Sequence, residues 1–148
     1  MMHSKRLQPL LEIARLKSRQ GMQAVAYVQN RLEAEKEKLR QLLICEAEYR
    51  EAGKNKEKQI VNAQSLKSLR QFKENVALAI QQQSGQIKAV ESQLEQVREH
   101  WRVLDARSQS LGKTRSRLLA AENSRIDKME QREMDESASQ SARNKAGL

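Results

Sequence analysis

Apolar residues recur every three or four positions through most of the chain, in two separate stretches. The first stripe comprises Leu7, Leu11, Ala14, Ser18, Gly21, Val25, Val28, Leu32, Glu35, Leu39, Leu42, Glu46 and Tyr49. The second comprises Leu66, Leu69, Lys73, Val76, Ile80, Gln83, Ile87, Val90, Leu94, Val97, Trp101, Leu104, Ser108, Leu111 and Leu118. A repeat of about 3.5 residues keeps one face of a helix against a neighbouring helix, so each stripe predicts a coiled-coil seam. Polar residues such as Ser18, Glu35 and Glu46 are expected to weaken the first seam locally.

The periodicity stops at a cluster of glycine, asparagine and charged residues near Gly53. The predicted order is a first coiled-coil helix in residues 1–51, a connecting loop in 52–62, a second and longer coiled-coil helix in 63–137, and a frayed tail in 138–148. Asn62 is expected to cap the second helix, because its side-chain oxygen accepts a bond from an otherwise unpaired amide. Two helices joined by a short loop run antiparallel. The predicted fold is therefore all-α, an antiparallel two-helix coiled-coil hairpin with unequal arms.

The longer second helix is expected to overhang the first. Counting outward from the loop places Leu7 opposite about residue 107, which leaves about thirty residues of the second helix without a partner. The apolar residues left exposed by this count are Leu111, Leu118, Leu119, Ile126 and Met129. Gly112 then falls where the paired region ends and is expected to act as a joint, since glycine weakens a helix by about 1 kcal/mol relative to alanine. A helix without packing is marginally stable in water, so the overhang predicts a partner protein.

Composition supports a narrow helical seam and argues against a thick globular core. Apolar residues make up 38% of the 148, with one proline and five glycines. No run approaches the roughly 18 apolar residues of a membrane span, and a continuous apolar signal segment is lacking. With Cys45 as the one cysteine, no internal disulfide forms. These features predict a cytoplasmic protein. The formal net charge of +9 allows an acidic partner.

Catalytic motifs are lacking in the sequence, and no enzyme activity is expected. A two-helix coiled coil offers no deep pocket, and neither a phosphate loop nor a metal-ligand spacing is present. We therefore predict no catalytic residue, no metal, no cofactor and no small-molecule substrate. His100 and Cys45 are interpreted as ordinary helix residues. Trp101 is expected to pack across the seam against Ile13 and Ala14.

Tyr49 and Phe72 are unusual, because a two-stranded seam near the loop does not need aromatic side chains. Either they pack at the edge of the seam, or they anchor a partner.

The C-terminal stretch 118–142, LLAAENSRIDKMEQREMDESASQSA, resembles the end of FliJ, the coiled-coil component of the flagellar type III export apparatus. The likeness is strongest at the Met134, Asp135, Glu136 step. Gln71 and Phe72, followed by Ala79 and Ile80 and then by Trp101, are also similar to that family. The match in order and spacing extends from Leu10 to Ala142.

The resemblance implies a stalk, similar to the central stalk of rotary ATP synthases, that links a hexameric export ATPase to the export-gate membrane protein and handles export chaperones. It also implies peripheral association with the inner membrane. By position, the export-gate contact is expected at Leu42, Tyr49, Phe72, Val76 and Ala79. The ATPase-ring contact is expected at Leu11, Arg15, Leu118, Leu119, Arg125, Ile126 and Met129. Cys45 and Gln83 depart from the larger or aromatic-like groups that the family more often has there.

Three alternatives remain open at this point. Virulence-type secretion systems have a related stalk protein of similar size. A basic coiled coil can also bind nucleic acid, although clustered cations interleaved with aromatics are lacking here. A structural coiled coil can self-associate through its exposed stripe.

Overall fold

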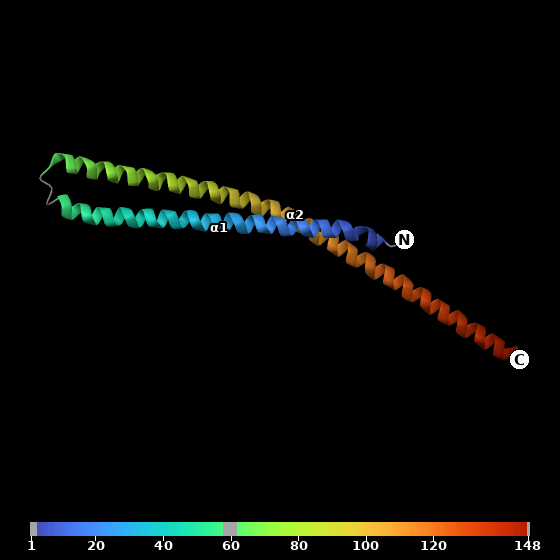
Figure 1. The fold of residues 1–148 in the computed structure, drawn as a ribbon. Coiled ribbons are helices and arrows are strands. Elements are labelled where there is room, and N and C mark those ends of the chain that lie inside the picture. Colours follow the sequence, from blue (N-terminus) through green and yellow to red (C-terminus); the bar gives the residue numbers. More distant parts are fainter. Residues whose placement is uncertain (1–2, 58–61, 148) are drawn as a thin grey trace. The chain divides into compact units, whose positions relative to one another are not determined.

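In the computed structural model, the described residues, 3–57 and 62–147, form two long helices. Helix α1 spans His3–Glu57, and helix α2 spans Ala63–Ala146 (Figure 1). The two helices pack against each other, so the prediction of an all-α helical hairpin is confirmed. The chain divides into two compact units: a terminal unit, Met1–Arg19 with Arg102–Leu148, and a central unit, Gln20–Trp101.

In the central unit the helices run side by side in opposite directions, and an apolar seam joins them (Figure 1). Its buried core is Val28, Leu32, Ile87, Val90 and Leu94, with Val25, Leu39 and Val97 packed against it. All eight are positions of the two predicted stripes. Periodicity therefore identified this seam correctly, because a continuous coiled-coil interface depends on spacing alone.

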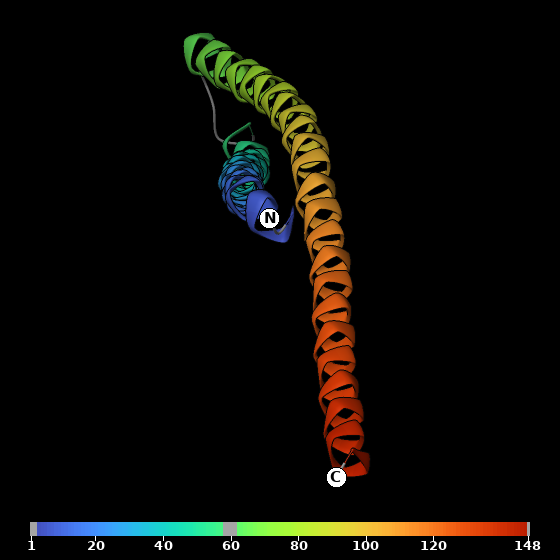
Figure 2. The same ribbon diagram turned by 90° about the vertical axis from the view of Figure 1, so that its right-hand side faces the viewer.

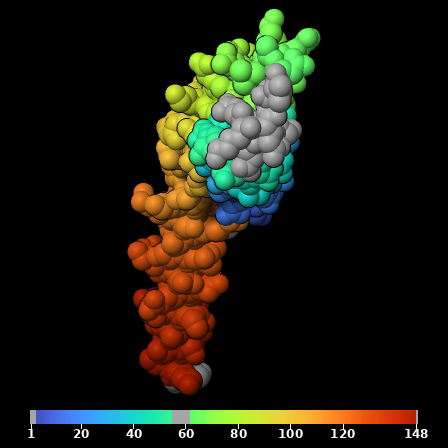
Figure 3. All heavy atoms as spheres, turned by 90° about the vertical axis from the view of Figure 1, so that its left-hand side faces the viewer, coloured from blue at the N-terminus to red at the C-terminus, as the bar shows by residue number. Residues whose placement is uncertain are grey.

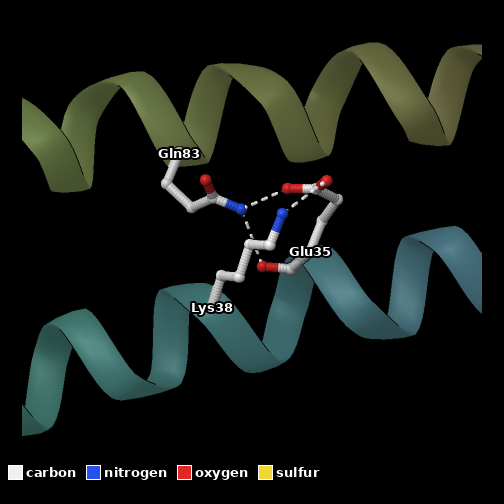
Figure 4. Close-up of polar contacts among 3 residues, drawn as sticks. All are labelled: Glu35, Lys38 and Gln83. Atoms are coloured by element: carbon white, nitrogen blue, oxygen red, sulfur yellow. Dashed lines mark hydrogen bonds and ion pairs between the residues drawn. The ribbon is translucent and has the colours of Figure 1, made fainter.

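The polar seam residue Glu35 is buried but has a hydrogen-bond partner across the seam, Gln83 (Figure 4). Gln83 Nε2 donates to the Glu35 carboxylate at 2.6 Å and to the Glu35 backbone carbonyl at 2.9 Å. Lys38 Nζ lies 3.5 Å from the other carboxylate oxygen. These contacts lower the pKa of Glu35, the hydrogen bond from Gln83 most of all. The expected weak point is thus a polar layer that ties α1 to α2.

The predicted loop at 52–62 is too long, because α1 continues to Glu57. Gly53 is buried, and a Cβ placed there would lie 3.5 Å from the Lys73 side chain and 3.7 Å from the Leu69 side chain. These are ordinary contact distances, so α2 packs beside Gly53, and the glycine does not break α1. The part of the predicted loop at 58–61 lies outside the described residues.

Helix α2 begins at Ala63, as predicted. The Asn62 side-chain oxygen accepts a hydrogen bond from the Gln64 amide at 3.0 Å, and the Asn62 carbonyl accepts one from the Leu66 amide at 3.4 Å. The expected cap at Asn62 is confirmed.

In the terminal unit the seam combines buried apolar residues with polar bridges. Leu11 is 1% exposed, and Ala14 is also buried. The buried Ser18 hydroxyl donates to the Asp105 carboxylate at 3.1 Å. At the start of α1, the Ser4 hydroxyl and amide donate to the Glu122 carboxylate at 2.6 and 3.3 Å.

These contacts correct the predicted register. They place residue 4 beside 122 and residue 18 beside 105, so Leu7 lies opposite roughly residue 118 instead of 107. The error follows from the predicted loop, because a longer α1 meets α2 closer to the C-terminus.

The corrected register also changes the expected positions of several residues. A Cβ at Gly112 would lie 3.9 Å from Leu11, so this glycine is inside the paired region and not at its end. Ile13 and Ala14 line a groove with Leu104 and Arg107, where Trp101 was expected. The leucines expected to be exposed are half-buried: Leu111, Leu118 and Leu119.

Beyond Glu122, every residue from 123 to 147 is exposed. This exposed arm is part of the same continuous α2 (Figure 2), and its side chains are drawn in orange-red to red in Figure 3. Helix α2 continues to Ala146, so the predicted frayed tail at 138–148 is helical as far as that residue. Arg143 and Lys145 occupy the last turn, where cations complement the negative end of the helix dipole.

Candidate functional site

An aromatic stack marks one surface of the central unit, near the beginning of α2. The rings of Tyr49 and Phe72 are stacked, with centroids 3.7 Å apart and an interplanar angle of 21°. Tyr49 and Phe72 also line an open, largely apolar hollow with Val76. The two half-buried aromatic side chains, one from each helix, therefore stack on each other beside this hollow.

The structure brings together three of the five residues predicted for the export gate: Tyr49, Phe72 and Val76. Leu42 and Ala79 are half-buried and do not line the hollow. The sequence prediction missed four lining residues: Glu46, Arg50, Lys73 and Ala77. Spacings of four residues from Glu46 to Arg50 and from Lys73 to Ala77 were the available signal, since such residues share a helix face.

Charge borders this aromatic hollow. Arg50 and Glu46 form an ion pair with an N···O distance of 2.7 Å, one turn apart on α1. Both side chains of this ion pair are partly exposed, so the pair contributes little to the stability of the fold. It holds the two charged side chains in place at the rim of the hollow.

A second surface lies in the terminal unit, where α1 begins. Its hollow is lined by His3, Leu118, Ala121, Glu122, Arg125, Ile126 and Met129. Four of these are predicted ATPase-ring residues: Leu118, Arg125, Ile126 and Met129. His3, Ala121 and Glu122 were missed, because their place beside the others depends on the register.

The other three predicted ring residues lie elsewhere in the terminal unit. Leu11 is buried in the seam. Arg15 lines a different hollow, together with Lys113 and Arg117. Leu119 is half-buried and lines neither hollow. The ring-contact prediction therefore divides into an apolar part at the arm and a basic part on the paired region.

Glu122 connects the arm to the first turn of α1. That turn contains no acidic residue, and its unpaired amides carry partial positive charge. The carboxylate accepts the Ser4 hydroxyl and amide, and these contacts, the hydroxyl first, lower the pKa of Glu122. Glu122 thus acts as an N-cap supplied by the other helix and fixes where the exposed arm begins.

Positive charge is concentrated in the paired region of the terminal unit, residues 3–19 and 102–121. Its ten cations are Lys5, Arg6, Arg15, Lys17, Arg19, Arg102, Arg107, Lys113, Arg115 and Arg117. Its two acidic residues are Glu12 and Asp105, which leaves a net charge of +8 (10 − 2) out of +9 for the whole chain. This region is suited to an anionic partner surface.

The described residues contain no group of three or more acidic, histidine or cysteine side chains arranged to hold a metal ion. Neither α1 nor α2, as far as they are described, contains a stretch apolar enough to cross a membrane.

A family model described as "Flagellar FliJ protein" matches residues 2–147, nearly the whole chain. Neither the curated proteins nor the solved structures include a significant match.

Proposed function

Because the chain belongs to the FliJ family of flagellar export proteins, we propose that it is the central stalk that couples a hexameric export ATPase to the export gate. Membership itself places the protein in flagellar type III export, among structural components and outside the enzyme families. It also implies association with the flagellar export apparatus. This favours the flagellar system over the virulence alternative.

The observation that carries the proposal is the exposed arm. Ile126, Met129 and Met134 are 39%, 60% and 70% exposed. They lie in the part of α2 that extends beyond its pairing with α1. An unpacked helix gains stability when another protein covers its apolar face. The pore of an ATPase ring would provide such a cover, and the adjoining basic region, with its net charge of +8, would attract an anionic surface there.

The gate contact is proposed at the Tyr49–Phe72 stack. A rigid pair of aromatic rings beside an apolar hollow is typical of a binding hot spot, because it loses little entropy on binding. The two surfaces belong to different units, so separate substitutions test them separately. Export chaperones are further proposed partners, with no surface assigned to them.

Stimulation of the purified export ATPase tests the ring contact. In the double variant Ile126→Glu/Met129→Glu, two carboxylates replace apolar side chains on the arm, and we expect most of the stimulation to be lost. Leu78→Glu is the control, because Leu78 is 53% exposed in the central unit. Equal stimulation by all three proteins would show that the arm does not engage the ATPase.

Binding to the cytoplasmic part of the gate protein tests the other surface. Phe72→Ala removes one ring of the stack and is expected to weaken gate binding by about 2 kcal/mol or more, as hot-spot aromatics do. ATPase stimulation should remain. The matched control is Tyr27→Ala, since Tyr27 is 70% exposed and outside the stack. If both variants bind the gate equally well, the stack is edge packing only.

A further inference from the structure

The terminal unit contains an apolar groove between α1 and α2 that is distinct from the surfaces described above. It is lined by Leu10, Ile13, Ala14, Lys17, Leu104 and Arg107. Leu10 and Ile13 are 50% and 52% exposed, so two large apolar side chains of this groove are accessible to a partner. Lys17 and Arg107 flank the groove, and neither pairs with an acidic side chain of the described chain.

The exposed arm has one face with the opposite character. Ile126, Met129, Glu130 and Glu133 follow the spacing i, i+3, i+4, i+7, which places them on one side of the helix. Glu130 and Glu133 have no cationic partner within the described residues. The arm therefore presents two apolar side chains beside two unpaired carboxylates.

We propose that two copies of this chain associate, with the arm face of each copy lying in the groove of the other. Ile126 and Met129 cover the exposed Leu10 and Ile13. Glu130 and Glu133 face Lys17 and Arg107, whose charges are opposite.

A symmetric pairing satisfies both surfaces at once. Suppose that two α2 helices run antiparallel, with residue 130 of the first copy near residue 106 of the second. Two-fold symmetry then also places residue 106 of the first copy near residue 130 of the second. The two-fold axis then passes near Leu118, midway between them. One contact repeated by symmetry fills both grooves and covers both arms.

Charge argues for a second copy as the occupant. The segment 127–136 contains five acidic residues and two cations, a net charge of −3 (2 − 5), on a chain whose total is +9. The arm cannot reach its own groove, because α2 is one continuous helix from Ala63 to Ala146 and the groove lies some twenty residues earlier on it. A second copy supplies the same acidic arm without this constraint.

The inference does not depend on the proposed function, but it has a consequence for it. Ile126 and Met129 belong to the proposed ATPase-ring contact as well as to the arm face. A dimer of this kind and a ring-bound stalk therefore exclude each other, and dissociation would precede assembly.

Paired charge reversals test the contact by sedimentation equilibrium at low salt. The arm variant is Glu130→Lys/Glu133→Lys, and the groove variant is Lys17→Glu/Arg107→Glu. We expect each variant alone to raise the dimer dissociation constant at least about tenfold, since four attractive contacts become repulsive. An equimolar mixture of the two variants should recover dimerisation, because every reversed arm then meets a reversed groove.

Recovery in the mixture shows that the variants are folded, and circular dichroism of each checks this independently. The matched control is Lys113→Glu/Arg117→Glu, which makes the same change in net charge at the other hollow of the same unit and should leave the dimer intact. A wild-type chain that stays monomeric at its solubility limit would overturn the proposal. So would a mixture that fails to dimerise, or a control pair that abolishes the dimer as fully as the groove pair.

Discussion

The central and terminal units pack the same two helices in different ways. In the central unit most of the seam is a cluster of valine, leucine and isoleucine side chains around Val90, which is 1% exposed, with one polar layer at Glu35 and Gln83. In the terminal unit the seam is bridged by serine hydroxyls, from Ser4 to Glu122 and from Ser18 to Asp105. Apolar burial gives more stability for the same area, whereas polar pairs in a seam select one register. The contrast suggests that the central unit holds the hairpin together and the terminal unit fixes where the arm starts.

The two units also differ in net charge. The central unit has 13 cations and 11 acidic residues, a net charge of +2 (13 − 11), and contains ion pairs such as Arg40–Glu37. The paired region of the terminal unit has a net charge of +8. A balanced surface is suited to solvent, and an unbalanced one is suited to a partner of opposite charge.

The largest effect on stability is expected from the apolar cluster. Leu32→Ala removes a side chain that is 5% exposed, and we expect a loss of about 2–5 kcal/mol in the free energy of unfolding, from lost burial and the remaining cavity. Chemical denaturation followed by circular dichroism measures this. A loss below about 0.5 kcal/mol, the size of an ordinary surface substitution, would contradict the central unit's role.

A polar bridge of the terminal unit should contribute less. Ser18→Ala removes the hydrogen bond to Asp105, whose carboxylate keeps its bond from Gln109 at 2.8 Å. The expected loss is about 1 kcal/mol, as for a typical intramolecular hydrogen bond. The same denaturation experiment measures this loss in the free energy of unfolding. A loss equal to that of Leu32→Ala would contradict the contrast between the units.

Two helical glycines, one in each unit, allow a matched comparison. A Cβ at Gly85 meets no atom within 4 Å, and a Cβ at Gly112 meets Leu11 at an ordinary contact distance of 3.9 Å. Each substitution by alanine should therefore stabilise the protein by about 0.5–1 kcal/mol, through the lower entropy of the unfolded chain. If Gly112→Ala destabilises while Gly85→Ala stabilises, the contact with Leu11 is too tight for an added methyl group.

The smallest effect is expected at the contact between Ser4 and Glu122. Because the pKa of Glu122 is lowered in the folded protein, the contact stabilises the fold above the ordinary glutamate pKa and is lost as the pH falls through the lowered value. An NMR titration should show the Ser4 amide following the Glu122 carboxyl. Ser4→Ala should return the pKa of Glu122 toward its ordinary value, and an unchanged pKa would exclude Ser4 as the cause of the shift.

Periodicity was enough to predict the apolar seam but not its register. The stripes around Val28 and Val90 repeat every three or four residues whatever lies opposite, so they were found from spacing alone. Register depends on where α1 ends, and Gly53, expected at a break, lies inside α1, which continues to Glu57. One misjudged glycine therefore displaced Leu7 by several residues along α2.

The same limit explains which site residues were found. Phe72 and Tyr49 stood out because aromatics are unnecessary at a seam edge, and their stacking confirms that they lie together. His3 and Glu122 are 119 residues apart in sequence (122 − 3), and no local pattern links them. Contacts between distant residues follow from the register, so a sequence pattern cannot supply them.

Hydrogen exchange with and without the hexameric export ATPase tests the central claim most directly. The claim is that the exposed arm, residues 123–147, is the part of α2 that the ATPase ring covers. In the free protein its amides should exchange much faster than those around Val28 and Val90, because no packing protects them. With the ATPase present we predict strong protection of the arm and little change in the central unit. Unchanged exchange of the arm in a complex that demonstrably forms would contradict the account.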